Sequence, residues 1–322
     1  MSIFSKRFFT AAALWLVTLS VASAADIPTL LAEGRVDDAI SSLQGKLSTA
    51  PNDGESYNLL CRAYFSLGNW DRGIPYCEKS IKLSPGNSNY HMWMGRIYGE
   101  KADRANFLAA ANLAGKVRTE FETAVKLDPS NAEARTDLAE FYLEAPGIVG
   151  GGHDKAEAQA KGLDGLDPWR AHWVRGRIAE KNKDLVTAEK EYRAAIDVSH
   201  GSALSWLNLA LFFRNHNRLD EMEDAIRHAS AAQTGHSEVL VDAAETLNRT
   251  GRSIPTAIEL LRRYLSSSST VEAAPAFKAH YLLGTLLEKE GDKQAAAQEY
   301  RSALALAKSY SAAQDALNRL NR

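Results

Sequence analysis

The stretch from Gly54 to Pro85, GESYNLLCRAYFSLGNWDRGIPYCEKSIKLSP, decides how this 322-residue chain folds. Its first half repeats large apolar residues one helical turn apart and ends in a turn at Gly68 and Asn69. Its second half repeats small residues and closes with Leu-Ser-Pro. Because proline cannot continue a helical hydrogen-bond ladder, Pro85 ends the second helix. The stretch therefore predicts two antiparallel helices joined by a short turn.

The same pattern returns along the chain at a fixed spacing. Small residues at the level where the paired helices cross lie 34 residues apart, from Cys61 to Gly95, from Gly176 to Ala210, and from Ala210 to Ala244. Small side chains there let the two helices of a pair come close. A helix pair of this kind cannot bury its apolar face alone, so the repeats are expected to stack into an array.

A helix–turn–helix repeat of this length, with these small and aromatic positions, resembles the tetratricopeptide repeat. The resemblance implies an all-α, right-handed α-solenoid in which each helix pair packs only on its neighbours. It predicts a shortened first repeat at 27–51, full repeats over 54–308, a closing helix at 309–322, and a linker-like hinge at 266–276, all within a superhelix over 25–322.

Two segments are longer than the repeat requires. Residues 99–116 hold about ten extra residues, rich in alanine, which predict lengthened helices or an extra helical turn. Residues 144–153, EAPGIVGGGH, separate two paired helices, and we expect Asp154 to cap a helix that begins at Lys155. Both segments resemble a group of exported bacterial tetratricopeptide proteins, and no established activity accompanies that resemblance.

The first 24 residues have the organisation of an export signal. Lys6 and Arg7 precede an apolar stretch from Phe8 to Val21, and Ala22-Ser23-Ala24 matches the small-x-small pattern before a signal-peptidase cut. The apolar stretch is shorter than the ~20 residues that a membrane-spanning helix needs. We expect cleavage after Ala24, a periplasmic or secreted protein, and no stable membrane insertion afterwards. An uncleaved anchor is the alternative.

Composition and motifs narrow the function. Lys and Arg total 38 against 40 Asp and Glu, giving a formal charge of −2, which argues against a nucleic-acid binder. The sequence holds no P-loop, HExxH or Gly-x-Ser-x-Gly motif, so we predict a protein that is not an enzyme and needs no metal or cofactor. The alternative is a small-ligand binder or enzyme that uses the glycine-rich loop at 147–154.

Cys61 and Cys77 lie on the paired helices of one repeat, near the level where these cross. In an oxidising compartment they can form a disulfide that closes a loop of about 16 residues. Two buried thiols acting as small hydrophobic groups are the alternative. The sequence leaves both open, because it does not give the spacing of the Cβ atoms.

In the tetratricopeptide family the first helices line a concave surface that usually holds the partner. The resemblance places on that surface Asn58, Arg62, Phe65, Met92, Arg96, Glu140, Trp173, Arg177, Leu211, Arg214 and Tyr281, together with Thr136, Leu143, Leu207, Val241 and Glu245. The residues of the carboxylate clamp of chaperone-binding relatives are not reproduced as a set.

Three arginines, Arg62, Arg96 and Arg177, occupy equivalent positions in three repeats. Such a column can grip carboxylates of a bound peptide, with Trp173 as an anchor. The alternative is that the arginines pair with neighbouring acids. We predict a protein–protein interaction scaffold of the cell envelope whose partner is a protein or peptide. Self-assembly through exposed ends is a further alternative.

Overall fold

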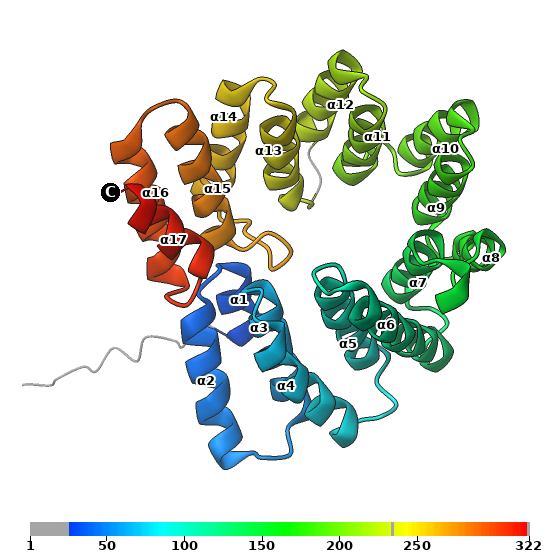
Figure 1. Cartoon of the computed structure of the whole chain (residues 1–322), viewed down its shortest axis with the longest axis horizontal. Helices are drawn as coiled ribbons and strands as arrows, with labels where there is room; N and C mark the ends of the chain where they lie inside the picture. The colour runs from blue at the N-terminus through cyan, green and yellow to red at the C-terminus, as the bar shows by residue number, and fades with distance from the viewer. Residues whose placement is uncertain (1–25, 233–234, 321–322) are drawn as a thin grey trace, which may run out of the picture.

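The computed structural model describes residues 26–232 and 235–320, which are helical with short connections (Figure 1). The predicted leader, with its cut after Ala24, lies outside these residues. The helices are α1 (Ile27–Ala32), α2 (Val36–Thr49), α3 (Gly54–Ser66), α4 (Trp70–Leu83), α5 (Ser88–Ala102), α6 (Phe107–Leu127), α7 (Ala132–Glu144), the 3₁₀ turn η1 (Gly147–Val149), α8 (His153–Leu163), α9 (Pro168–Lys181), α10 (Leu185–Val198), α11 (Ala203–Asn215), α12 (Leu219–Ala231), α13 (Glu238–Thr250), α14 (Ile254–Ser266), α15 (Ala276–Lys289), α16 (Lys293–Leu306) and α17 (Ser311–Leu320).

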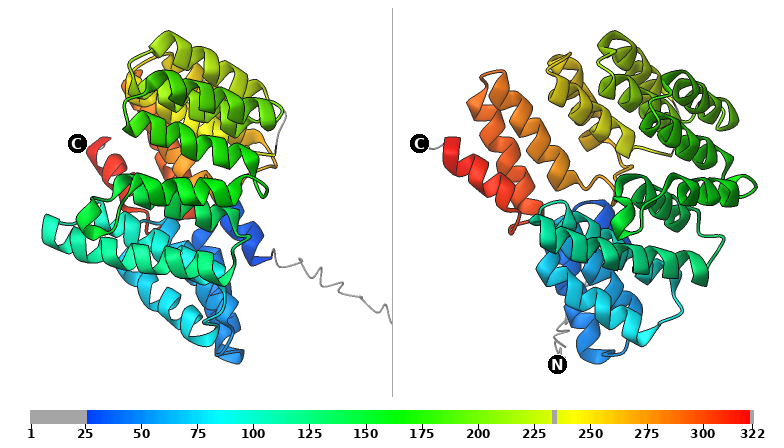
Figure 2. Two further views of the ribbon diagram at one scale, coloured as in Figure 1. Left: turned by 90° about the vertical axis from the view of Figure 1, so that its right-hand side faces the viewer. Right: turned by 45° about the vertical axis from the view of Figure 1, so that its right-hand side comes forward.

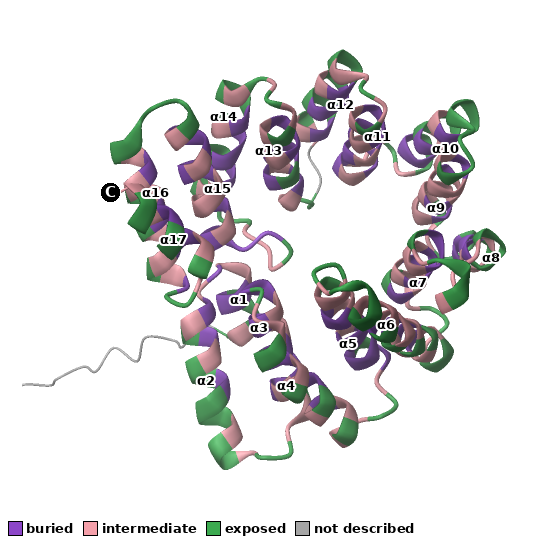
Figure 3. Cartoon of the chain, in the orientation of Figure 1, coloured by how far each residue is buried: buried purple, intermediate pink, exposed green. Residues whose placement is uncertain are grey.

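Capping residues set where several first helices begin. Asp53 accepts a hydrogen bond from the backbone N–H of Ser56 at the start of α3, and Asn131 accepts one from that of Ala134 at the start of α7. These side chains satisfy N–H groups that have no partner within the helix. The prediction of an all-α array of helix pairs is confirmed, and buried residues follow the faces where the helices pack (Figure 3).

Glycines set the close approach of paired helices. A Cβ at Gly284 would lie 2.6 Å from the ring of Tyr300, and one at Gly95 would overlap the ring of Phe121. Phe121 and Tyr300 come from the second helices of these pairs, α6 and α16. The glycines therefore allow an aromatic ring to occupy the helix crossing.

The expectation that each helix pair packs only on its neighbours is wrong at the two ends of the array. Leu31 and Leu43 of the first repeat share one buried core with Phe277, Ala303 and Ala313 of the last helices. The array therefore closes into a ring, and the views of Figures 1 and 2 show that it follows a curved, non-planar path. A sequence repeat specifies the contact between neighbours but not the total curvature, so it does not predict this closure.

Backbone contacts join the two ends as well. The N–H of Lys308 donates to Oδ2 of Asp37 over 2.7 Å. Gly34 has a φ of +73°, and a Cβ there would lie 2.7 Å from the backbone nitrogen of Ala276. Only glycine combines this left-handed conformation with so close an approach.

Residues 267–275, named the strap below, connect α14 to α15 and correspond to the segment interpreted as a hinge. The hydroxyl of Tyr264 donates to the carbonyl of Ala274 and accepts from the N–H of Val271 over 3.1 Å. Ala274 is buried. The strap is therefore fixed at both of these points by one side chain.

The two longer segments have different structures. In the first, α6 extends to 21 residues and Asn106 caps its start by accepting from the N–H of Ala109. In the second, α8 begins at His153 after Gly152, so the expectation that Asp154 caps a helix from Lys155 is wrong. The reason is that the turn η1 and the following glycines bring the chain into helical geometry two residues earlier. In the described part of the chain, no helix is long and apolar enough to cross a membrane.

Candidate binding surface on the concave side

The first helices of successive pairs line the inside of the ring, and the second helices lie outside (Figure 1). A chamber of about 660 Å³ opens on this inner side. It is lined by α3, α5, the starts of α7 and α9, the strap and the start of α15. Five of the predicted partner-binding residues line it, namely Asn58, Arg62, Phe65, Met92 and Arg96.

Arg62 reaches across the chamber to the strap. Its Nε donates to Oε1 of Glu272 over 2.8 Å, and its Nη2 donates to Oε2 of the same carboxylate. Its guanidinium carbon lies 5.1 Å from the ring centroid of Trp93. The ion pair is thus bidentate and lies over an aromatic face, the arrangement that suits arginine best.

Arg96 is held by acids of the next repeat. Its Nε donates to Oδ2 of Asp137 over 2.6 Å and its Nη2 donates to Oε2 of Glu133 over 3.0 Å. Burial disfavours the charge, but the attraction of Asp137 and Glu133 raises the pKa of Arg96 above its ordinary value. Its guanidinium carbon lies 4.9 Å from the centroid of Trp93, so this indole contacts both Arg96 and Arg62.

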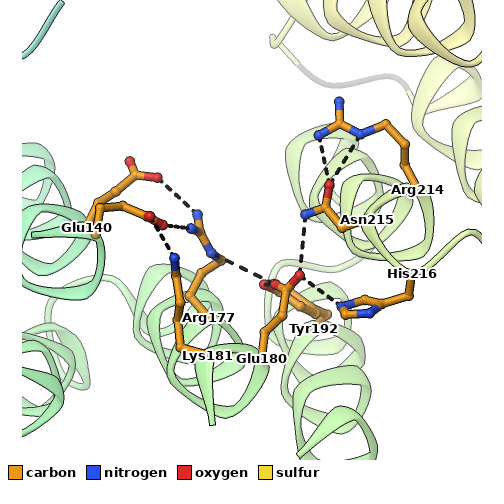
Figure 4. Close-up of polar contacts among 9 residues, drawn as sticks. Glu140, Arg177, Glu180, Lys181, Tyr192, Arg214, Asn215 and His216 are labelled. Carbon is orange, nitrogen blue, oxygen red and sulfur yellow. Dashed lines mark hydrogen bonds and ion pairs between the residues drawn. The ribbon is translucent and has the colours of Figure 1, made fainter. Parts of the chain in front are cut away.

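The third arginine of the column lies in a network that joins three repeats (Figure 4). Arg177 donates to Oε1 of Glu140 over 3.0 Å and to Oε1 of Glu144 over 2.5 Å. Glu180, one turn along α9, accepts from the hydroxyl of Tyr192 over 2.9 Å and contacts Nε2 of His216 over 3.0 Å. The guanidinium is therefore already paired within the chain.

The remaining predicted residues do not line the chamber: Tyr281 lies on α15 one turn from Lys278, and the others lie farther round the ring. Trp173 is half-buried with the guanidinium of Arg177 5.6 Å from its ring centroid. Arg214 donates to Oδ1 of Asn215 over 3.0 Å, and Tyr281 packs on Tyr300. Leu211 is half-buried and packs against the core of the second half of the array. These residues therefore do not join the chamber around Arg62.

Several residues that the family resemblance places on the concave surface are buried between helices. They are Asn58, Met92, Thr136, Leu143, Leu207 and Val241, each at most 9% exposed. Trp93, one residue after Met92, is half-buried and contacts both arginines. Sequence reasoning missed it, although the helical period would have placed it on the inner side. Asn58 is 1% exposed, and within the described ranges its Nδ2 has no hydrogen-bond partner.

Sequence reasoning also missed Lys278, a further cation of the chamber. It lies on α15 of the last repeat, and sequence position alone gives no sign that it faces α3. Burial lowers its pKa, and nothing in the described ranges forms an ion pair with its ammonium group. Ring closure therefore adds Lys278 and Glu272 to a surface built otherwise from the first repeats.

The two cysteines form a disulfide in the structure. Their Cα atoms are 5.2 Å apart, and the bond joins α3 to α4 of one repeat. Both residues are fully buried. The disulfide therefore fixes the helix pair that carries Asn58 and Arg62.

The glycine-rich loop uses its own N–H groups internally. The N–H of Gly150 donates to Gly147, that of Gly151 to Pro146, and that of Gly152 to Tyr142. An anion cradle needs such groups to point at the ligand. The loop geometry therefore does not favour phosphate as the ligand in the small-ligand alternative. Across the described ranges, no group of three or more His, Cys, Asp or Glu side chains suits a metal ion.

Comparisons with known proteins agree with this architecture. Models of the tetratricopeptide repeat match residues 30–97 and 239–319. No curated protein matches the sequence. The structure is similar to yeast Tom70, with a TM-score of 0.53 at 15% identity over 89% of this chain and 58% of that one.

Two further solved structures are similar. One is Cut9–Hcn1 of the APC/C, with a TM-score of 0.42 and 15% identity over 92% of this chain and 54% of that one. The other is the thermophilic protein TTC0263 of Thermus thermophilus, with a TM-score of 0.48 and 19% identity over 57% of this chain and 93% of that one. The chain spans less than three fifths of Tom70 and of the matched Cut9–Hcn1 chain. The helix pairs, their crossing glycines and the two family matches lead to one conclusion: the chain is a tetratricopeptide-repeat protein.

Proposed function

We propose that this protein is a non-catalytic scaffold that binds a segment of a partner protein inside the ring, at the chamber around Arg62. Tetratricopeptide repeats are interaction modules, and the observation that carries the proposal is the composition of the chamber wall. Trp93, Phe65 and Tyr90 lie there beside Arg62 and Arg96. Aromatic and arginine side chains dominate the binding energy of protein interfaces.

The size and the rigidity of the chamber support a peptide ligand. A volume of about 660 Å³ holds a few side chains of an extended segment. The disulfide between Cys61 and Cys77 and the core shared by the first and last repeats fix its walls. A preformed wall lowers the ordering cost of binding.

We also propose that the protein works outside the cytoplasm, in the cell envelope or as a secreted protein. The leader pattern of residues 1–24 supports this location. A disulfide is stable in such an oxidising compartment. The proposal would be contradicted if the full-length protein were recovered uncleaved from the cytoplasmic fraction of cells that express it.

Capture of partners from envelope extract with three matched proteins tests the binding surface. Trp93→Ala removes the aromatic side chain that contacts both arginines. Val186→Ala removes an apolar side chain that is 84% exposed on α10, a second helix on the outside of the ring. A partner of the chamber is retained by the wild type and by Val186→Ala and is lost with Trp93→Ala. Equal recovery of each protein by all three would exclude the chamber as the binding surface.

A further inference from the structure

We infer that the chamber recognises an acidic side chain on an extended segment, and that the strap is its resident, displaceable occupant. This inference rests on the proposed function and specifies its ligand. Glu272 already shows the recognition, since its carboxylate lies bidentate on Arg62 above Trp93. Its side chain is 19% exposed, and Ala273 beside it also lines the chamber.

The strap has the properties of a bound peptide. It reads SSSTVEAAP, with Glu272 as its single charged residue, and it has no helical structure. Its hydrogen bonds to Tyr264 lie on the α14 side, at Val271 and Ala274. On the chamber side, Glu272 supplies its ion pair. Loss of that pair therefore removes the chamber-side contact. The strap is then held by Tyr264 and by the bond from Ser237 to Ser269, so it opens more often.

The charges of the chamber favour a carboxylate as the group that replaces Glu272. Arg96 is paired with Asp137 and Glu133, and Arg170 is paired with Asp167. The carboxylate of Glu55 accepts a hydrogen bond from Tyr90. When Glu272 leaves, Arg62 has no ion-pair partner in the described part of the chain. Lys278 forms no ion pair there either, although the charges of Glu100 and Glu245 act on it from farther away. Two half-buried cations that line one chamber favour an anion, because a buried charge is costly without a partner.

A ligand that displaces Glu272 must compete with a carboxylate that is tethered to the same chain. A carboxylate held by a short linker acts at an effective concentration of about millimolar. A free peptide of the same chemistry therefore binds weakly to the wild type and more tightly when Glu272 is removed. The strap thus sets a minimum binding affinity, which a natural partner exceeds through additional contacts around the ring.

The chain's own strap provides the probe. A fluorescein-labelled peptide SSSTVEAAPA is titrated into the wild type, Glu272→Ala, Glu272→Ala with Arg62→Gln, and the control Glu290→Gln, which changes an exposed acid at the end of α15. We expect affinity for Glu272→Ala at least tenfold higher than for the wild type and for Glu290→Gln. We expect the gain to vanish with Arg62→Gln and with the peptide SSSTVQAAPA. Equal affinity of the wild type and Glu272→Ala would overturn the inference and leave the proposed function standing.

If no variant binds the peptide, hydrogen exchange separates the claim that the chamber binds a peptide from the claim that the ion pair of Arg62 and Glu272 holds the strap. That outcome would count against peptide binding in the chamber, and the strap is then assessed through the N–H of Val271, which is bonded to Tyr264. Faster exchange across residues 267–275 in Glu272→Ala than in Glu290→Gln supports the ion pair as the contact that holds the strap in the chamber. Identical exchange in both variants would overturn that role.

Discussion

The guanidinium of Arg62 on α3 is bound by the carboxylate of Glu272, which lies 210 residues later in the chain. This pair spans the first and last parts of a repeat array, which in an open solenoid would lie far apart. Ring closure supplies the missing wall of the concave surface, because the strap and α15 face α3 and α5 across the chamber. The concave surface thereby gains a second wall at this chamber.

Gly34→Ala should weaken ring closure. The new methyl group would sit in a left-handed backbone conformation, 2.7 Å from the nitrogen of Ala276, so we expect a loss of about 2 kcal/mol or more. Gly45→Ala is the matched control, since Gly45 lies within α2 with nothing within 4 Å of the added Cβ. It should stabilise by about 0.5–1 kcal/mol. Urea unfolding of both variants measures the difference, and equal midpoints would contradict the packing described here.

Gly95→Ala should destabilise the pair α5–α6. Its Cβ would overlap the ring of Phe121, and overpacking of this kind costs about 1–3 kcal/mol. Gly99→Ala, one turn along the same helix, meets nothing within 4 Å and should be neutral or stabilising. Thermal unfolding monitored by circular dichroism compares them. A Gly95→Ala protein as stable as Gly99→Ala would show that the two helices do not approach so closely.

His91 should make stability depend on pH. Its Nδ1 lies 2.7 Å from Oε2 of Glu120, and this hydrogen bond raises the pKa of the buried imidazole, while burial opposes the rise. Because the pKa of His91 is higher in the folded state, its protonated form stabilises the fold. This contribution to the free energy of unfolding is complete below the unfolded-state pKa of about 6.5 and is lost as pH rises through the folded-state pKa. The stability difference between wild type and His91→Gln should therefore shrink from pH 5.5 to pH 8.5.

Glu120→Gln provides the control for this titration, since it removes the charged acceptor and leaves the imidazole in place. The difference in the free energy of unfolding between Glu120→Gln and the double variant Glu120→Gln, His91→Gln should vary much less with pH. A difference between wild type and His91→Gln that stays constant over the whole range would rule out the proposed coupling.

Reduction should destabilise the first full repeat. The disulfide between Cys61 and Cys77 closes a loop with a sequence separation of 16, which corresponds to about 3 kcal/mol. Dithiothreitol should lower the unfolding midpoint of the wild type and leave that of a Cys61→Ala, Cys77→Ala protein unchanged. A wild-type midpoint insensitive to reductant would mean that the disulfide does not form in solution.

The sequence predicts the local structure well because the repeat encodes it. The crossing glycines and the prolines fix helix pairs, and some contacts of the arginine column follow from the same period. Arg177 meets Glu140 across 37 residues and Arg96 meets Asp137 across 41 residues, each in the neighbouring repeat, which a helical projection of neighbouring repeats can place. These pairs favour the alternative interpretation, in which arginines pair with neighbouring acids.

Ring closure and the chamber could not be predicted in this way. The total curvature accumulates from small rotations between helix pairs, and no single residue carries it. Glu272 and Lys278 therefore show no relation to Arg62 in the sequence, although all three line one chamber. Trp93 was missed for a different reason: the transferred positions lie one residue away from the side chain that faces inward, and Met92 is buried beside it.

Hydrogen exchange at α1 tests ring closure most directly. This helix has six residues, too few to be stable alone, and its buried Leu30 and Leu31 pack in the core that contains Phe277. We predict slow exchange across residues 27–34 in the wild type and at least tenfold faster exchange in Phe277→Ala, with α9 unchanged in both. If this segment of the wild type exchanged at the rate of an unstructured peptide, the array would be open, which contradicts ring closure.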